Sequence, residues 1–140
     1  MAMISKSPWI FHVATGGCNG CDIEILATLT PYFSVERAGV VLVGSPRHAD
    51  ILVVTGSVTK KMAPRLKRIY EQMPNPKAVV GVGTCPTSCC VFDGGSYSVA
   101  GPLNKILPVD AYVLGCPPRP MNILQALLVV AKKVGKEIKK

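Results

Sequence analysis

Short runs of aliphatic residues recur along the chain and are the strongest constraint on its fold. Two of them, Ile51-Leu52-Val53-Val54-Thr55 and Ala78-Val79-Val80-Gly81-Val82, contain no charged residue. An uninterrupted apolar run of this length is typical of a parallel strand that is buried on both faces. Further strands are expected at residues 9–14, 39–43 and 110–114.

Helical patterns lie between the expected strands. The first covers residues 21–29 and ends at Pro31, because proline cannot continue a helix. The second has Pro64 in its first turn, and the third covers residues 120–134. The inward faces predicted for these helices are, in order, Ile23, Leu26, Ala27 and Thr30; Leu66, Ile69, Tyr70 and Met73; and Ile123, Leu124, Leu127 and Leu128. Strands that alternate with helices predict a single α/β domain over residues 1–140, with a flavodoxin-like, doubly wound parallel sheet and helices on both faces.

Four cysteines follow the expected strands at the points where those strands end. Cys18 and Cys21 follow the first strand, Cys85 follows the fourth, and Cys116 follows the last. The carboxyl ends of parallel strands lie along one edge of a sheet, and α/β folds bind ligands at this edge. The four thiols are therefore expected to meet at one site.

Four sulfur ligands fit either an iron–sulfur cluster or structural zinc. Structural zinc usually draws its ligands as two close pairs, whereas here one pair, Cys18 and Cys21, joins two distant single cysteines. This arrangement favours one 4Fe-4S cluster, with zinc and unligated thiols as the alternatives. Residues 1–8 lack the pattern of a secretory signal, so that six cysteines indicate metal or redox use in a cytosolic chain.

Two more cysteines, Cys89 and Cys90, lie in the connection over residues 84–109, whose length is typical of a functional loop. The simplest interpretation is that both are small, buried side chains. The alternative is that Cys89 exchanges with Cys85 as a ligand or forms a redox pair with it.

Small and rigid residues flank the cysteines and are expected to shape their surroundings. Gly83 and Gly115 leave room for backbone N–H groups to face the sulfur atoms. Pro117 fixes φ and is expected to hold Cys116 in place. The same surroundings are expected to include Gly17, Gly20 and Thr84.

Charged residues near the motifs each have two interpretations. Glu24 is either a first-turn acid favoured by the helix dipole, or a group that helps to carry protons or orients the loop at an interface with a partner. Arg47 and His48 form either a charged turn or cations that face the cluster edge or a partner. Arg119 either offsets the charge of the cluster or anchors an interface, or it is a surface charge before the last helix. His12, inside an apolar strand, is expected to be a hydrogen-bonded core histidine.

The formal net charge is +8, and the cations form two groups. These are Lys60, Lys61, Arg65, Lys67 and Arg68, and Lys132, Lys133, Lys136, Lys139 and Lys140. Two solvated helix faces are the simplest interpretation, and contact with acidic partner subunits or anionic lipids is the alternative. No aromatic residues interleave with the cations, which argues against nucleic-acid binding. No apolar run is long enough to span a bilayer, so any membrane contact is expected to be indirect.

Taken together, the motifs resemble one family along nearly the whole chain. They are Gly17-Cys18-Asn19-Gly20-Cys21-Asp22-Ile23-Glu24, Ser45-Pro46-Arg47-His48-Ala49-Asp50, Gly83-Thr84-Cys85-Pro86, Pro108-Val109-Asp110 and Gly115-Cys116-Pro117-Pro118. The family is that of the small, proximal-cluster subunit of NiFe hydrogenases, which includes the 20-kDa subunit of respiratory complex I. The C-x-x-C spacing resembles the membrane-bound, energy-converting hydrogenases, because complex I subunits usually carry adjacent cysteines there. The family often has Gly-Gly where this chain has Cys89-Cys90.

The resemblance implies an electron-transfer subunit of an oxidoreductase complex, with a 4Fe-4S cluster held by Cys18, Cys21, Cys85 and Cys116. Its partners would be a ferredoxin-like cluster subunit, a large subunit that alone holds the NiFe site, and membrane subunits that translocate ions. The complex would reduce protons or oxidise hydrogen at the cytoplasmic side of the cell membrane. The alternatives are a nickel-free relative that reduces quinone or sulfane sulfur, a zinc-stabilised structural subunit, and a nucleotide- or flavin-binding module.

Overall fold

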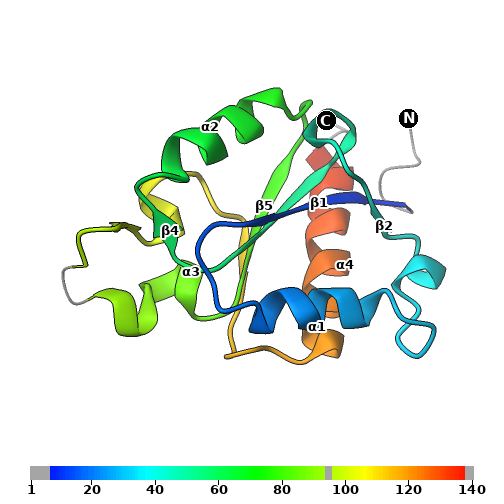
Figure 1. Ribbon diagram of the computed structural model, residues 1–140. Coiled ribbons are helices and arrows are strands. Elements are labelled where there is room, and N and C mark those ends of the chain that lie inside the picture. The colour runs from blue at the N-terminus through cyan, green and yellow to red at the C-terminus, as the bar shows by residue number, and fades with distance from the viewer. Residues whose placement is uncertain (1–6, 94–95, 138–140) are drawn as a thin grey trace.

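The computed structural model describes residues 7–93 and 96–137, and its centre is a parallel sheet (Figure 1). Five strands form this sheet: β1 (Trp9–Ala14), β2 (Val41–Leu42), β3 (Ile51–Thr55), β5 (Ala78–Val82) and β7 (Ala111–Val113). They lie in the order β2-β1-β3-β5-β7, and the neighbours pair in parallel. This is the flavodoxin-like order, in which the direction of winding reverses between β1 and β3. The predicted fold class is confirmed.

Helices cover both faces of the sheet because alternate strand residues point to opposite sides. The helices α1 (Gly20–Thr28) and α4 (Pro120–Glu137) lie on one face, and α2 (Ala63–Gln72) lies on the other (Figure 1). In β3, Ile51 and Val53 pack in the core beneath α1 and α4, whereas Leu52 and Val54 pack beneath α2. Burial of both faces explains why this strand is apolar throughout.

The long connection over residues 84–109 contains short elements that the sequence does not predict. A one-turn helix, α3 (Cys85–Ser88), follows β5, and β6 (Val99–Gly101) pairs in antiparallel orientation with β4 (Val58–Thr59). The 3₁₀ helices of the described residues are Val35–Ala38, Pro46–His48, Cys90–Asp93 and Leu103–Lys105. Most of the described residues of this connection therefore belong to a helix or a strand.

The predicted inward face of α1 is wrong. Ile25 and Thr28 are buried, whereas Ile23 is 64% exposed and Leu26 is 56% exposed. Thr28 can be buried because its hydroxyl donates a hydrogen bond to the carbonyl oxygen of Ile25 at 2.6 Å. Ala27 is half-buried and Thr30 is exposed. An apolar stripe of this helix thus faces away from the core of its own chain.

Two strands are shorter than predicted. β2 covers only part of the expected 39–43, and β7 lacks both ends of the expected 110–114. The carboxylate of Asp110 accepts a hydrogen bond from the N–H of Val79 at 3.0 Å, so that a side chain makes the contact where a strand residue would. α4 extends beyond its predicted end at residue 134.

Candidate metal centre at the carboxyl edge of the sheet

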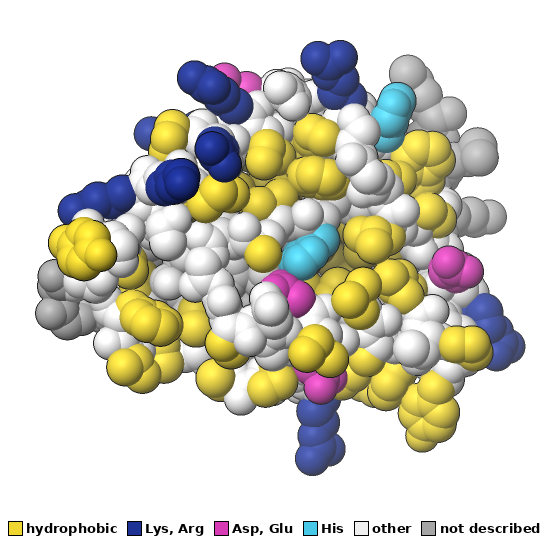
Figure 2. Space-filling view, viewed as in Figure 1, with side chains coloured by type: hydrophobic (Ala, Val, Ile, Leu, Met, Phe, Trp, Pro, Cys, Tyr) yellow, Lys and Arg dark blue, Asp and Glu magenta, His cyan; other side chains and the backbone are white. Residues whose placement is uncertain are grey.

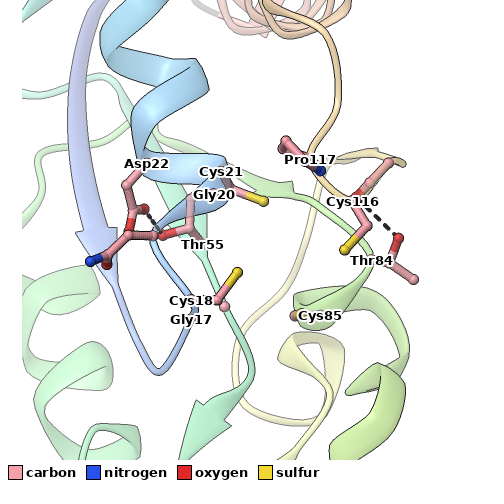
Figure 3. Close-up of a pocket in the computed structure, with 13 residues that line it drawn as sticks. Gly17, Cys18, Gly20, Cys21, Asp22, Thr55, Thr84, Cys85, Cys116 and Pro117 are labelled. Atoms are coloured by element: carbon pink, nitrogen blue, oxygen red, sulfur yellow. Dashed lines mark hydrogen bonds between the residues drawn. The ribbon is translucent and has the colours of Figure 1, made fainter.

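Four cysteines from three loops line one cavity of about 100 Å³. Cys18 and Cys21 come from the loop after β1 and the first turn of α1, Cys85 begins α3 after β5, and Cys116 lies between β7 and α4. Figure 3 shows that the sulfur atoms of Cys18, Cys21 and Cys116 point toward the same space, beside Cys85. None of these four thiols is in a disulfide. They are called the four-cysteine site below.

Glycines bring the loops after β1 and β3 into direct contact beside the site. A Cβ atom on Gly56, where φ is +80°, would lie 2.5 Å from the backbone nitrogen of Gly17. The hydroxyl of Thr15 donates to the carbonyl oxygen of Thr55 at 2.9 Å, which is a second link between the same two segments. Only a residue without a side chain permits the two backbones to approach so closely.

The loops that carry Cys85 and Cys116 are joined by Thr84. Its backbone N–H and its hydroxyl both donate to the carbonyl oxygen of Gly115, at 3.0 and 3.1 Å. Gly115 has a φ of +149°, and a Cβ there would lie 2.6 Å from the Cα atom of Pro118. These contacts fix the separation of the two single cysteines.

At two of the four cysteines, Cys21 and Cys85, the surroundings disfavour the thiolate unless a positive group is bound. Burial raises the pKa of the Cys21 thiol to about 11, and the neighbouring Cys85, Cys116 and Cys18 add to this effect. Burial also raises the pKa of Cys85, and the charges of neighbouring cysteines raise it further. Metal ions remove this penalty because they bind thiolates and neutralise their charge.

The donor set of the site therefore fits a metal group of several atoms. All four donors are sulfur, and they stand around a cavity larger than one water molecule needs. Within residues 7–93 and 96–137, no three His, Cys, Asp or Glu side chains approach closely enough to bind one metal ion. The four thiols thus line a cavity with room for more than a single atom.

Most of the residues expected around the cysteines are found there. Gly17, Gly20, Thr84, Gly115 and Pro117 line the cavity. Gly83 lies behind Cys21, as its contact with the sulfur atom shows. Glu24, which is half-buried in α1, and the exposed Arg119 are not among the lining residues.

Arg47 and His48 lie at the other end of the sheet, which corrects the expectation that they face the cluster edge. Both belong to the 3₁₀ helix that precedes β3. The ring of His48 contacts that of Trp9, the first residue of β1, with centroids 6.5 Å apart. The cysteines follow the carboxyl ends of β1, β5 and β7, at the opposite edge of the parallel sheet, so these two cations do not reach the four-cysteine site.

Cys89 is buried, as predicted, but Cys90 is exposed. Both residues have a positive φ, of 58° and 50°, where the chain turns out of α3. This backbone conformation favours glycine and is uncommon for other residues. Glycine at both positions would adopt this conformation without the steric cost that a Cβ atom brings.

Three side chains beside the cysteines form a hydrogen-bonded group that the sequence does not predict. The carboxylate of Asp22 accepts hydrogen bonds from the hydroxyl of Thr55 at 2.5 Å and from Nε2 of His12 at 3.0 Å. His12 is hydrogen-bonded as expected, but its side chain is 24% exposed and does not lie in the core. The sequence feature that could have pointed to this group is the position of Asp22, directly after Cys21.

The fold and the site define an α/β protein with a four-cysteine site at the carboxyl edge of a flavodoxin-like sheet. The chain belongs to the family described as "NADH ubiquinone oxidoreductase, 20 Kd subunit", whose model matches residues 18–130. Members of this family bind an iron–sulfur cluster.

Three relatives illustrate the range of the family. A "Probable membrane-bound hydrogenase subunit mbhJ" of Pyrococcus furiosus is 55% identical, over 97% of this chain and 81% of its own length. "Formate hydrogenlyase subunit 7" of Escherichia coli is 48% identical over 86% of this chain, which spans 47% of that protein. An NADH-quinone oxidoreductase subunit of Geotalea daltonii is 46% identical over 88% of this chain and 71% of its own length.

Solved structures agree with these relationships. A chain of the archaeal membrane-bound sulfane sulfur reductase has a TM-score of 0.77 and 34% identity, over 92% of this chain and 72% of that chain. A chain of the NAD⁺-reducing NiFe hydrogenase has a TM-score of 0.67 over 89% of this chain and 92% of that chain, and at 18% identity it supports the fold alone. This protein is thus a subunit of an oxidoreductase complex of the hydrogenase and complex I type. None of the helices in the described ranges combines the length and hydropathy needed to cross a membrane.

Proposed function

We propose that the chain carries one 4Fe-4S cluster in the four-cysteine site and relays electrons within a membrane-bound, ion-translocating NiFe hydrogenase. The electrons pass between a ferredoxin-like cluster subunit and the NiFe site of a large subunit. The arrangement of four thiols around one cavity is the observation that carries the proposal. The identity of 55% to a probable membrane-bound hydrogenase subunit supports the type of complex.

A cluster explains the site better than zinc does. A tetrahedral zinc ion holds four sulfur atoms at about 2.3 Å from one point, and structural zinc sites are closed. The thiols here instead surround a cavity of about 100 Å³. When bound, an iron–sulfur cluster supplies one-electron transfer, and its potential depends on nearby charges, hydrogen bonds and solvent. The chain's own part is to hold the sulfur atoms apart and to shield them.

The exposed apolar side chains beside the site support a large partner at this edge. Ile23 and Leu26 of α1 are exposed, and so are Leu114 and Met121, which flank the loop of Cys116. Figure 2 shows hydrophobic side chains gathered over α1, whereas Lys and Arg gather over α2. Contiguous exposed apolar surface of this kind marks protein interfaces. A large subunit that covers it would also shield the cysteines from water.

The remaining assignments follow from the same proposal. The complex also contains ion-translocating membrane subunits, and this chain is a peripheral subunit at the cytoplasmic side of the membrane. Glu24 carries protons at the interface with the large subunit, and a Glu24→Gln variant with full turnover would remove this role. Arg119 follows the Cys116 motif and helps to anchor the interface.

A nickel-free complex is the second candidate, and a specific observation favours it. The sulfane sulfur reductase chain superimposes with a TM-score of 0.77 at 34% identity. In such a complex the chain would carry the same cluster, and the large subunit would reduce sulfane sulfur or quinone. The four-cysteine site does not distinguish the two, because nickel would lie in the partner.

Elemental analysis of the complex, purified anaerobically through a tag on this chain, tests the proposal. Iron with nickel, together with hydrogen evolution from a low-potential donor, supports the hydrogenase. Iron without nickel and without hydrogen evolution identifies the nickel-free relative. Zinc without iron at this chain contradicts the cluster itself. Replacement of Cys85 by Ser should lower the iron content of the complex, whereas replacement of the exposed Cys90 should not.

A further inference from the structure

Three side chains from three elements meet at one carboxylate oxygen beside the four-cysteine site. Oδ1 of Asp22, in α1, accepts a hydrogen bond from the hydroxyl of Thr55, the last residue of β3, at 2.5 Å. Nε2 of His12, in β1, lies 3.0 Å from the same oxygen and 3.1 Å from Oγ1 of Thr55. A carboxylate can only accept, so Nε2 of His12 carries the hydrogen in this contact. The carboxylate is thus fixed from two directions.

This group of side chains forms part of the wall of the cysteine cavity. Asp22 and Thr55 both line the cavity, and Asp22 is covalently next to Cys21. Figure 3 shows Asp22 and Thr55 joined by a hydrogen bond on the side of the cavity where Cys18 and Cys21 lie. Because Asp22 lines the same cavity as the four cysteines, its charge acts on a group bound there.

We infer that Asp22 is a positioning residue that lowers the reduction potential of the group in the four-cysteine site, and that Thr55 and His12 hold its carboxylate in place. The inference rests on the proposed function, because it presumes a redox group at the site. Reduction adds negative charge, and a fixed negative charge nearby opposes it. The Asp22 side chain is only 16% exposed, so solvent screens its charge less than that of a surface acid.

The second part of the inference concerns the geometry. An aspartate without partners can rotate toward water, where its charge is screened and its effect on the sulfur atoms is weakened. Two donors on one oxygen prevent this rotation. The network also links the first turn of α1 to β1 and β3, which orients the turn that presents Cys21.

A redox titration of the intact complex, followed by the electron paramagnetic resonance signal of the cluster next to the large subunit, tests this inference. In Asp22→Asn we expect the midpoint potential to shift upward, with the iron content unchanged. In Thr55→Val we expect a smaller upward shift, because the charge remains but is no longer held. Thr55→Ser keeps the hydroxyl and should restore the original potential. Glu36→Gln, which removes an exposed acid on the 3₁₀ helix Val35–Ala38, is the matched control and should cause no shift.

The outcomes separate the inference about Asp22 from the proposed function. A normal cluster signal with an unchanged potential in Asp22→Asn overturns the inference and leaves the proposed function intact. Should Asp22→Asn lose iron, Thr55→Val decides: an upward shift supports the inference, and an unchanged or lower potential overturns it. A complex whose unmodified chain gives no iron–sulfur signal contradicts the proposed function, and the inference with it.

Discussion

Gly83 lies directly against the thiol of Cys21, since a Cβ atom on Gly83 would be 2.7 Å from Cys21 Sγ. The φ of Gly83 is +99°, a conformation that other residues rarely adopt. Two independent constraints therefore require glycine at this position. One comes from the backbone and the other from the sulfur atom.

A Gly83→Ala variant should lose iron from the complex. The new methyl group would displace the Cys21 sulfur atom. The strained backbone would also raise the free energy of the folded chain by about 1–3 kcal/mol. The measurement is iron per complex after anaerobic purification. Gly44→Ala is the matched control, because no atom lies within 4 Å of a Cβ placed there. Equal iron contents in the two variants would contradict this account.

Gly81 provides a test of packing away from the cysteines. It pairs with Tyr112 across β5 and β7, and a Cβ on Gly81 would lie 2.7 Å from Cδ1 of the tyrosine ring. We expect Gly81→Ala to lower the free energy of unfolding by roughly 1–3 kcal/mol, the usual cost of overpacking. Urea denaturation measures this. The double variant Gly81→Ala/Tyr112→Ala relieves the clash, so it should be less destabilised than the sum of the two single variants; strict additivity would argue against a direct clash.

The exposed stripe of α1 should matter for assembly and not for folding. Ile23→Ser and Leu26→Ser should each change the stability of the chain by no more than about 0.5 kcal/mol, because both side chains are exposed. Recovery of the large subunit in a pull-down through this chain should fall, most strongly in the double variant. Val91→Ser, at another exposed apolar residue, is the control. Undiminished recovery with the double variant would show that the partner binds elsewhere.

Asp50 should make stability depend on pH. Burial raises the pKa of its carboxyl above the ordinary value of 3.8, although the N–H of Trp9 donates to Oδ2 at 3.0 Å and acts in the opposite direction. The folded chain therefore holds its proton more tightly than the unfolded chain, and stability is lost as the pH rises through the interval just above 3.8.

An Asp50→Asn variant removes this dependence, because the amide still accepts from Trp9 and cannot ionise. We expect the variant and the unmodified chain to be equally stable below the ordinary Asp pKa, and the variant to be the more stable at neutral pH. Thermal unfolding across this pH range measures the difference. In Glu36→Gln, the difference in stability from the unmodified chain should not change with pH in this way. A variant that is less stable at neutral pH would mean that the ionised carboxylate stabilises the fold.

The meeting of the four cysteines could be predicted because it depends on topology alone. Once strands are parallel, their carboxyl ends share an edge, whatever the loops do. The Asp22 network could not be predicted in the same way. It requires the register that pairs His12 with Val53 and Ala14 with Thr55, and it requires the rotation of α1. Neither is visible in residue spacing.

Two of the sequence-based predictions are wrong for physical reasons. Apolar periodicity identified the helix at α1, but it cannot distinguish a stripe that faces the chain's own core from one that remains exposed, as Ile23 and Leu26 do. Arg47 and His48 lie between two expected strands, and one of the two interpretations was that they face the cluster edge and offset its negative charge. Their position before β3 puts them at its amino end, and the direction of a strand decides which edge a loop joins.

The origin of the four thiols in three loops has a consequence for biosynthesis. Cys18 lies near the beginning of the chain and Cys116 lies beyond β7, so no local fragment contains the complete ligand set. Contacts between such distant segments carry a loop-closure entropy cost and are intrinsically slow to form. If the four-cysteine site holds the proposed cluster, the complete set of ligands exists only once the ribosome has released Cys116, beyond the last strand. A cluster bound by all four cysteines would then indicate that the sheet has assembled.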